Sequence, residues 1–308
     1  MARRKKGKAI NGWLALDKPE EMTSTAALGA VKRLFDAAKA GHGGTLDPLA
    51  SGLLPIAFGE ATKTVSFLVD SLKVYRFTVA WGHETDTDDR EGAVTASSDN
   101  RPGDAEIRAA LGQFTGHILQ VPPRFSAKKI KGQRAYDLAR EGIEPELEAR
   151  EVHIKSLRIV EQNLPERTAF EAICGKGTYV RAIARDLGRA LGTFAHVVAL
   201  RRTHVGPFGP DTMISLDRLE EISHSAAGCE ALKAELHPVT TVLDDIPALA
   251  VSQGEAAKLR SGQPIILRGR DAPVNCGAAY AVCQGSLVAL GEVERGELHP
   301  TRVFKLSL

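Results

Sequence analysis

Residues 41–55 combine glycines, one histidine and one carboxylate in a stretch that neither helix nor strand periodicity explains. Glycines let a backbone turn tightly or approach a ligand closely. Asp47 is the only acidic residue between Asp36 and Glu60, so it is a lone carboxylate among small and apolar residues. Such a carboxylate can act as a base or as a nucleophile. Asp47 followed by Pro48 also fits the start of a helix, with the aspartate at the N-cap, and both interpretations stay open.

A second stretch with chemical potential is basic and runs from Pro122 to Glu141. Before Glu141, at its end, the cations are opposed only by Asp137, and aromatic residues lie among them. The cations are Arg124, Lys128, Lys129, Lys131, Arg134 and Arg140, and the aromatic residues are Phe125 and Tyr136. Cations interleaved with aromatic rings suit a phosphate backbone and exposed bases. A charged, solvated helix face is the alternative.

A third charged stretch, the acidic loop, contains Asp86, Asp88, Asp89 and Glu91. Carboxylates at alternate positions are typical of a calcium loop, but no glutamate stands at the twelfth position of an EF-hand pattern. We therefore expect a solvated turn there and no metal site. The Gly-Lys-Gly-Thr run at 175–178 likewise lacks the spacing of a phosphate-binding P-loop.

The chain has 308 residues, enough for two domains that each bury a core. Its composition is that of a soluble globular protein, with 43% hydrophobic residues, 25% charged residues and a net charge of +2. Any affinity for nucleic acid must therefore come from local basic patches. No apolar run reaches the roughly 18 residues that a membrane helix needs.

The cysteines and the N-terminal residues indicate the cellular compartment in which the protein is expected. The cysteines are Cys174, Cys229, Cys276 and Cys283, which lie far apart without a C-x-x-C pair. This spacing argues against a disulfide framework or a metal site and fits a reducing cytoplasm. Residues 1–10 are basic, but no apolar region follows, so they are not a secretory signal. They form either a solvated tail or an arm that contacts phosphates.

Periodicity predicts an α+β arrangement around the glycine-rich stretch. The predicted strands cover residues 12–17, 74–81, 116–121, 151–161 and 168–175 and a segment around 197–202. The predicted helices run from a Thr23–Ser24 cap to Phe35, over 60–69, over 104–114, and from Gly175–Arg181 to Leu191. From about residue 241 short strands and turns dominate, with one helix near 252–260, which predicts a small β-rich domain.

Residues 41–55 resemble the G-H-x-G-x-L-D-P-x-A-x-G-x-L-P motif of TruB-type tRNA pseudouridine synthases. Further motifs of that family occur in the family's order between residues 10 and 220. They are Asn11-Gly12, Leu16-Asp17-Lys18-Pro19, Thr23-Ser24, Lys73-x-Tyr75, Gly82 with Thr85-Asp86-Thr87-x-Asp89, Gly175-Lys176-Gly177-Thr178-Tyr179-x-Arg181, and Leu200-Arg201-Arg202. Glu21 departs from the pattern, because the family usually has glycine there, and this affects the turn after Pro19. The C-terminal residues resemble a PUA RNA-binding domain.

The resemblance implies an α+β fold: a pseudouridine-synthase-like catalytic domain over 11–243, with a mixed, mainly antiparallel sheet flanked by helices, and a PUA-like domain over 244–308. A basic RNA-gripping insertion at about 122–150 belongs to the first domain. The implied reaction isomerises uridine to pseudouridine in the T-loop of tRNA, at uridine 55. The bond from ribose C1′ to uracil N1 breaks, the base rotates and it rejoins through C5. No atom is gained or lost, so we expect no cofactor and no metal, but the base must be flipped out.

The resemblance assigns Asp47, Tyr75 and Arg181 to catalysis. Asp47 would either attack C1′ or remove a proton from C2′, with Arg181 as the cation that keeps it ionised. Tyr75 is expected to stack on the flipped uracil. The other expected substrate contacts are Tyr179 near the base, Leu200 as an apolar wall, His42 entering the RNA loop, and Lys128, Lys129 and Lys131 at phosphates. From pattern alone, Tyr75 also fits a half-buried strand position, Leu200 a core position and Arg181 a helix surface.

The expected partner is the T-arm of tRNA, with no membrane and no obligatory protein partner, and we expect a monomer in the cytoplasm. Two other functions share parts of this pattern. One is an RNA-binding or tRNA-folding protein whose pocket only holds the loop, against which the set of Asp47, Tyr75 and Arg181 argues. The other is a subunit of a guide-RNA-dependent pseudouridine synthase, which needs partner proteins, and no extended lysine-rich tail favours it.

Overall fold

The computed structural model describes residues 7–126, 147–163, 165–226, 228–269 and 272–306, and the backbone of 129–130 and 133–134. Residues 1–6 of the predicted tail, Lys128, Lys131 and the side chain of Lys129 lie outside the described residues. Within the described ranges, no helix is long and apolar enough to cross a membrane.

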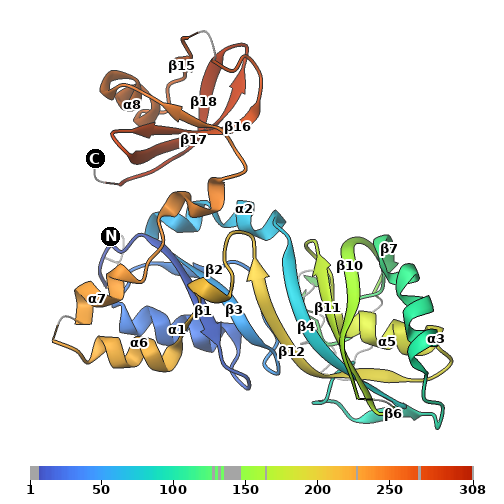
Figure 1. Ribbon diagram of the computed structural model, residues 1–308. Helices are drawn as coiled ribbons and strands as arrows, with labels where there is room; N and C mark the ends of the chain where they lie inside the picture. The colour runs from blue at the N-terminus through green and yellow to red at the C-terminus, as the bar shows by residue number, and fades with distance from the viewer. Residues whose placement is uncertain are drawn as a thin grey trace.

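One mixed sheet of nine strands organises the larger part of the chain (Figure 1). In spatial order its strands are β13 (Ile214–Ser215), β1 (Gly12–Lys18), β3 (Ser51–Phe58), β12 (Ala195–Val205), β4 (Lys73–Trp81), β11 (Arg167–Cys174), β10 (Arg150–Asn163) and β7 (Gly116–Gln120), and β2 (Ala40–His42) pairs with β3. Only the β13–β1 and β12–β3 pairs among these described strands are parallel. The expected mixed, mainly antiparallel sheet is therefore confirmed.

The nine-stranded sheet consists of two halves that meet at a short junction, which we call the seam. There β3 and β12 pair in parallel through two positions, Arg201 opposite Ser51 and Arg202 opposite Gly52. The N-terminal half contains β13, β1, β3 and β2, and the second half runs from β12 to β7. Because so little backbone pairing crosses the seam, side chains must help to set the distance between the halves.

Helices cover the sheet where the sequence places apolar stripes. The Thr23 hydroxyl accepts a hydrogen bond from the Ala26 N–H at 3.0 Å, which makes Thr23 the N-cap of α1 (Ser24–Leu34), as predicted. Helix α5 (Val180–Ala190) packs against β12 and β4. Its buried stripe at helical spacing is made of Val180, Ile183, Ala184 and Leu187.

Residues 59–70 do not form the single helix that their pattern predicts. A 3₁₀ helix, η1 (Gly59–Lys63), is followed by the short α2 (Val65–Asp70). The break lies at buried Thr64, whose N–H and hydroxyl both donate to the Ala61 carbonyl, at 3.0 and 2.9 Å. A threonine hydroxyl that bonds to the nearby backbone competes with the regular helix.

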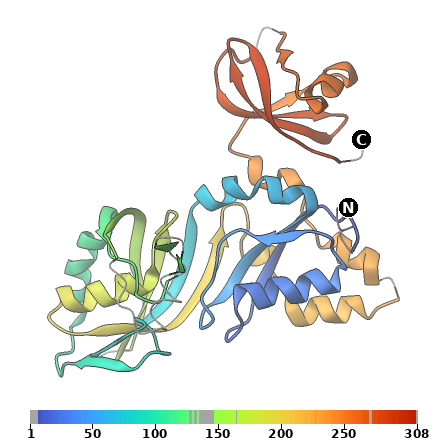
Figure 2. The same cartoon turned by 180° about the vertical axis from the view of Figure 1, so that it is seen from behind.

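Shorter elements complete this part of the chain. They are β5 (His83–Thr85), β6 (Val94–Ser97), α3 (Asp104–Ala110), η2 (Leu111–Phe114), the pair β8 (Lys129–Ile130) and β9 (Gln133–Arg134), η3 (Pro210–Thr212), α6 (Leu216–Ser223), α7 (Gly228–Ala234) and η4 (Val239–Leu243). The sequence patterns did not predict α6 and α7. Figure 2 shows α1 and α6 side by side on the N-terminal half of the sheet.

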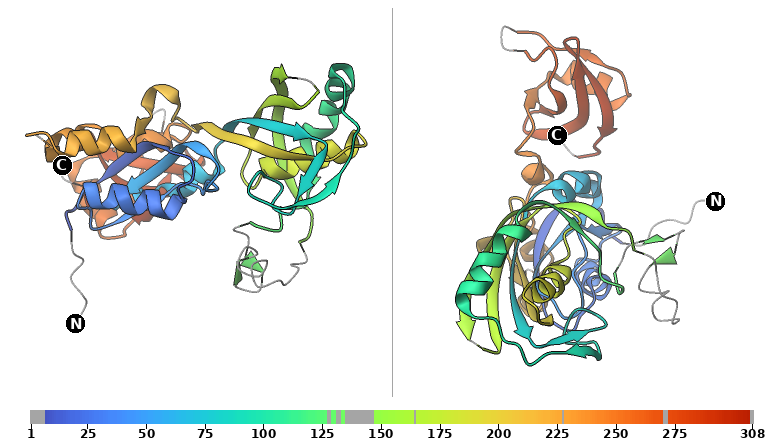
Figure 3. Two further views of the ribbon diagram at one scale, coloured as in Figure 1. Left: turned by 90° about the horizontal axis from the view of Figure 1, so that it is seen from below. Right: turned by 90° about the vertical axis from the view of Figure 1, so that its right-hand side faces the viewer.

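The C-terminal β unit is a second sheet with its own core. Its strands are β14 (Ala248–Ala250), β16 (Gly277–Cys283), β17 (Ser286–Glu294), β18 (Glu297–Val303) and β15 (Ile265–Ile266), and α8 (Gln253–Arg260) packs on it. Figure 3 shows this unit beside the N-terminal half and away from β7 and β10. Phe304 packs into an apolar cluster with Trp13 and Leu68, and Lys63 donates to the Val303 carbonyl at 2.7 Å. The unit therefore rests on η1 and α2.

Candidate active site

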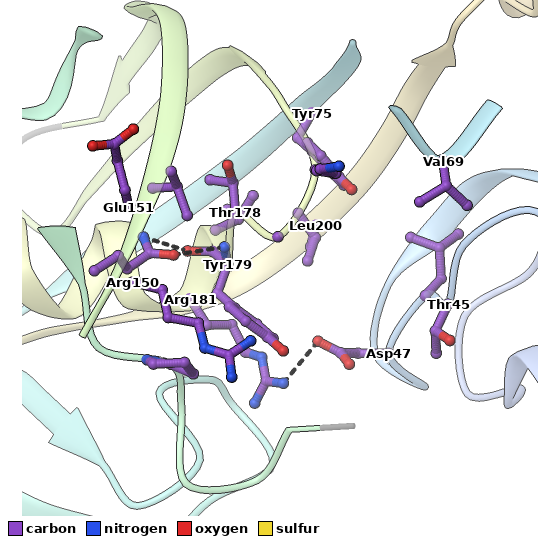
Figure 4. Close-up of a pocket in the computed structure, with 17 residues that line it drawn as sticks. Thr45, Asp47, Val69, Tyr75, Arg150, Glu151, Thr178, Tyr179, Arg181 and Leu200 are labelled. Atoms are coloured by element: carbon purple, nitrogen blue, oxygen red, sulfur yellow. Dashed lines mark hydrogen bonds and ion pairs between the residues drawn. The ribbon is translucent and has the colours of Figure 1, made fainter. Parts of the chain in front are cut away.

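A cleft of about 690 Å³ opens at the seam, between the loop 43–50 and the strands of the second half (Figure 4). Its lining includes five residues that come from four separate stretches of the chain. They are Asp47 of the loop, Tyr75 of β4, Tyr179 before α5, Arg181 within α5 and Leu200 of β12. The fold therefore brings together five of the residues that the sequence singled out.

Asp47 faces Arg181 across this cleft. Asp47 Oδ2 lies 2.9 Å from Arg181 Nη2, and the carboxylate is 37% exposed whereas the guanidinium side chain is only 4% exposed. Residues 48–49 form a turn, which the Ala50 N–H closes by donating to the Asp47 carbonyl at 3.1 Å. The N-cap interpretation is therefore wrong, because β3 begins at Ser51 and no helix follows Asp47.

Hydrogen bonds hold the loop 43–50 at its start and in its middle. The Gly43 N–H donates to the Pro55 carbonyl at 2.8 Å. The buried Ser24 hydroxyl donates to the Leu46 carbonyl and accepts from the Leu46 N–H, both at 2.8 Å. The first residue of α1 thus fixes the peptide immediately before Asp47.

Lys18 contacts the turn at Pro48, after Asp47 in the loop. Its side chain is fully buried, and Nζ donates to the carbonyls of Pro19 and Met22 at 2.7 Å and of Pro48 at 3.4 Å. Burial lowers the pKa of Lys18 to about 8, and the nearby Asp47 carboxylate opposes this shift. A buried cation therefore lies under the turn that carries the carboxylate.

Arg181 is anchored on the side away from Asp47. Its Nη1 donates to the Thr87 carbonyl at 2.7 Å and lies 3.3 Å from an Asp89 carboxylate oxygen, and its Nη2 donates to the Phe125 carbonyl at 3.0 Å. One guanidinium thus connects Asp47 to the acidic loop. The alternative of a helix-surface arginine is wrong, because this side chain is buried.

The acidic loop is only in part the solvated turn that we expected, because Glu91 is exposed and Asp86 half-buried, whereas the other two carboxylates are buried. Asp88 and Asp89 are 5% and 2% exposed, and Asp88 pairs with buried Arg185 at 3.0 Å. Burial raises the pKa of Asp88 to about 6, against the effect of Arg185, and burial also raises the pKa of Asp89. The prediction failed because the cations that cover these carboxylates come from α5, with Arg185 97 positions after Asp88.

Aromatic and apolar side chains form the other wall of the cleft. Leu200 is 6% exposed. Burial raises the pKa of the Tyr75 phenol above its ordinary value. The Tyr179 ring extends toward Asp47 (Figure 4). The Tyr179 backbone is fixed by Gln120, whose side chain accepts from the Tyr179 N–H at 2.8 Å and donates to its carbonyl at 3.1 Å.

His42 lies outside this wall, at the end of β2. It lines a second cavity of about 520 Å³, which has Asp47 and Arg181 in common with the cleft. Burial lowers the pKa of His42, and its Nδ1 is buried without a hydrogen-bond partner in the described structure. Asp47 and Arg181 therefore separate two spaces, so a ligand could extend on both sides of the carboxylate.

The site suits acid–base or nucleophilic chemistry on an organic substrate. It offers a carboxylate held by a guanidinium, next to an apolar wall and two tyrosines. In the described ranges, no group of three or more His, Cys, Asp or Glu side chains is placed to hold a metal ion.

Comparison with known proteins identifies the family. The model of the TruB family pseudouridylate synthase N-terminal domain matches residues 32–180, and that of the tRNA pseudouridylate synthase B C-terminal domain matches 181–244. The tRNA pseudouridine synthase B of Bradyrhizobium diazoefficiens is 58% identical over 97% of this chain and 87% of its own length. The chain belongs to the TruB family of pseudouridine synthases. The TruB-family protein of the same name from Caulobacter vibrioides is 52% identical over 100% of both chains.

Solved structures share the fold of this TruB-family chain. A chain in a crystal structure of a Cbf5-Nop10-Gar1 complex aligns with a TM-score of 0.73 and 25% identity, over 96% of this chain and 84% of that chain. A chain of an archaeal box H/ACA sRNP Nop10-Cbf5 complex gives the same TM-score at 24% identity, over 99% and 92%. The α+β fold implied by the resemblance is confirmed.

Three buried polar residues of the site had no predicted role, although the family motifs contain them. They are Lys18, Asp89 and Arg202. Only their presence in the family motifs could have indicated that these residues belong to the site, because a single buried charge produces no periodic pattern in the sequence.

Proposed function

We propose that the chain converts the uridine at position 55, in the T-loop of tRNA, to pseudouridine. TruB-family membership and relatives named tRNA pseudouridine synthase B support tRNA as the substrate and pseudouridine as the product. The observation that carries the residue assignment is the ion pair of Asp47 and Arg181, at 2.9 Å, in a cleft that also contains Tyr75.

In the proposed reaction the target uridine leaves its loop and enters the cleft, at a cost of a few kcal/mol of unstacking. Asp47 meets the ribose and either adds to C1′ or removes the C2′ proton. The C1′–N1 bond breaks and the uracil rotates. A C1′–C5 bond then forms as the bond between C1′ and Asp47 breaks or, in the other route, as the proton returns to C2′. C5 finally loses its proton and N1 gains one. Arg181 pairs with the Asp47 carboxylate, Tyr75 stacks on the uracil, and Leu200 forms the apolar wall. The reaction uses no cofactor.

Contacts to the rest of the RNA come from several segments. We assign His42 to the space that the flipped base leaves, and Tyr179 to a contact with the base. Lys128, Lys129 and Lys131, in the basic insertion at about 122–150, are assigned to phosphates, which attract lysine without regard to sequence.

The proposed organisation has three parts. Residues 1–10 are a basic tail, 11–243 the catalytic domain and 244–308 a PUA-like RNA-binding domain. The separate core of the C-terminal β unit supports this division. We propose that the chain works as a monomer in the cytoplasm on the T-arm of tRNA, without an obligatory protein partner.

The decisive test replaces the carboxylate. Asp47→Asn should bind a T-arm hairpin but form no pseudouridine, because an amide can neither attack C1′ nor accept a proton from C2′. Base analysis of the RNA after incubation measures the product, and a binding titration measures retention of the hairpin. The exposed Asp211→Asn is the matched control and should remain active. Pseudouridine formed by purified Asp47→Asn would contradict the assignment.

One structural likeness favours a second candidate, a subunit of a guide-RNA-dependent synthase. The 25% identical chain comes from a Cbf5-Nop10-Gar1 complex. The purified chain alone, incubated with a bare T-arm hairpin, separates the candidates. Conversion supports the stand-alone enzyme, and conversion only with added RNA and proteins supports the subunit. Binding without conversion under both conditions supports an RNA-binding or tRNA-folding protein.

A further inference from the structure

Arg202 lies at the seam and is buried, with 2% of its surface exposed. Its position on β12 is opposite Gly52 of β3 on one side and opposite Tyr75 of β4 on the other. Gly52 has φ +97°, and a Cβ there would lie 2.2 Å from the Arg202 carbonyl oxygen. The backbones of the two halves therefore approach so closely at Arg202 that only glycine fits opposite it.

The Arg202 side chain crosses the seam to the loop that carries Asp47. Nε donates to the Leu53 carbonyl at 2.8 Å, and Nη2 donates to the Gly44 carbonyl at 3.1 Å. Nη1 lies 3.5 Å from the Thr45 carbonyl. These carbonyls flank Asp47 on both sides, so one planar guanidinium joins the beginning of the loop to the strand β3 that follows it.

The same guanidinium also contacts Tyr75. Its central carbon lies 6.0 Å from the centre of the Tyr75 ring, within the range of a cation–π interaction. Arg181 holds the Asp47 side chain, whereas Arg202 holds the backbone of the loop and contacts the tyrosine. The two arginines thus act on different parts of the site.

A buried guanidinium that bonds to carbonyls is a costly way to stabilise a fold. Desolvation of a charge costs several kcal/mol, and well-packed apolar side chains often give equal or greater stability. A rigid planar fork of donors, however, can set the spacing of several acceptors at once. A site that is assembled from two weakly paired sheet halves needs a fixed distance between the residues on either half.

We propose that Arg202 is a positioning residue that sets the distance between Asp47 and Tyr75 across the seam. This inference rests on the proposed function. Arg202 touches neither the reacting atoms nor the RNA in this assignment, and it acts through the loop backbone and the tyrosine ring. Its loss should therefore slow the chemical step while binding of the RNA stays nearly unchanged.

The test uses the full chain with Arg202→Met, Arg202→Lys and Arg202→Ala. Misplacing a reacting group by about 1 Å costs about 100-fold in rate, so single-turnover pseudouridine formation by Arg202→Met should fall by about that factor. The dissociation constant of the T-arm hairpin should change by less than about threefold, as expected for a residue that acts on the chemical step. Arg202→Lys keeps the charge without the fork and should lie between wild type and Arg202→Met.

Two further measurements distinguish a positioning role of Arg202 from a role in folding: rescue of a variant by added guanidinium ion, and a control variant at the neighbouring residue. Millimolar guanidinium ion should restore part of the rate of Arg202→Ala, which has space for it, but not of Arg202→Met, which fills that space. Arg201→Met is the control and should keep the wild-type rate. It removes the adjacent arginine, whose side chain is 42% exposed and pairs with Asp17 at 2.8 Å.

Several outcomes would overturn the inference. A wild-type rate in Arg202→Met, a loss of rate that only follows the loss of RNA binding, or no rescue of a folded Arg202→Ala would each do so. Failure of all three variants to fold, by circular dichroism, would also overturn it, because Arg202 would then serve the fold itself. If wild type forms no pseudouridine, the proposed function fails instead.

Discussion

At the scale of single residues, the candidate site depends on charges that are paired inside the protein. Arg181 joins the half-exposed Asp47 to the buried Asp89, at 2.9 and 3.3 Å. Removing one member of a buried ion pair costs 3–5 kcal/mol, roughly, because the remaining charge has no partner. The pairing therefore restrains the Asp47 carboxylate, as the proposed reaction at the ribose requires.

The buried Lys18 should make the free energy of unfolding depend on pH. Folded Lys18 loses its proton near pH 8, whereas the unfolded lysine keeps it up to about pH 10.5. Between these values the unfolded state holds more protons, so raising the pH favours folding. The free energy of unfolding of wild type, relative to Lys18→Met, should therefore rise by about 2 kcal/mol from pH 7 to pH 9.5. Urea denaturation at both pH values measures it.

A second buried lysine provides a parallel test. Burial also lowers the pKa of Lys73 to about 8, so Lys73→Met should change the pH dependence with the same sign. For Lys18, the contradicting outcome is a difference in unfolding free energy between wild type and Lys18→Met that is the same at pH 7 and pH 9.5. That result would mean that Lys18 keeps its proton in the folded protein at pH 9.5.

At the scale of elements, the turn between β1 and α1 connects the fold to the site. Glu21 in this turn has φ +62°, in the left-handed region, where the family resemblance leads one to expect glycine. Its N–H donates to the Pro48 carbonyl at 2.8 Å, next to Asp47. The turn therefore contacts the loop through a residue that does not favour the left-handed backbone conformation.

Glu21→Gly should stabilise the protein by about 0.5 kcal/mol. A non-glycine residue in the left-handed region costs about 1–2 kcal/mol, and the added freedom of glycine in the unfolded chain offsets part of that gain. Urea denaturation measures the change. Glu20→Gly is the matched control and should destabilise, because Glu20 has no positive φ to relieve and pairs with Arg90 at 2.9 Å. Equal destabilisation by both variants would argue against strain at Glu21.

At the scale of the whole molecule, the cleft lies between two sheet halves and is supported from the side by the C-terminal β unit. That unit contacts η1 and α2 through Phe304 and Lys63, and Val69 of α2 lines the cleft. The rim of the cleft is therefore connected by packed side chains to the C-terminal β unit.

Phe304→Ala should loosen this connection. Truncating a buried phenylalanine costs about 3–5 kcal/mol, and here the loss falls on the contact between the two units. Amide exchange in residues 59–70 should become faster, as measured by mass spectrometry. Ile266→Ala is the control, because Ile266 is 58% exposed, and it should change stability by less than about 0.5 kcal/mol. Unchanged exchange in Phe304→Ala would show that α2 is stable without the C-terminal β unit.

The salt dependence of RNA binding also belongs to this scale. Replacing Lys128, Lys129 and Lys131 together with alanine should weaken binding of tRNA and reduce the salt slope by about 2 to 3, because each lysine at a phosphate releases about one counterion. Binding titrations at several salt concentrations measure the slope. As a control, replacing two other exposed lysines, Lys32 and Lys233, with alanine should leave the salt slope unchanged. An unaltered slope in the triple variant would exclude these phosphate contacts.

Much of the architecture could be predicted from local pattern. The cap at Thr23, the strand that carries Tyr75 and the helix that begins near Arg181 are present as expected, because period and capping chemistry act within a few residues. The helix expected over 60–69 is broken at Thr64 by a hydroxyl–backbone bond. The expected N-cap at Asp47 is absent because β3 begins too soon after it.

The sequence by itself determined the family, the mixed sheet and five of the residues that line the cleft, since the motifs and their order along the chain already specify them. Only the tertiary structure decided that Asp88 and Asp89 are buried, that Arg181 joins Asp47 to Asp89, and that Arg202 crosses the seam. The physical reason is that burial and charge pairing depend on partners far away in the chain, and no local pattern carries that information.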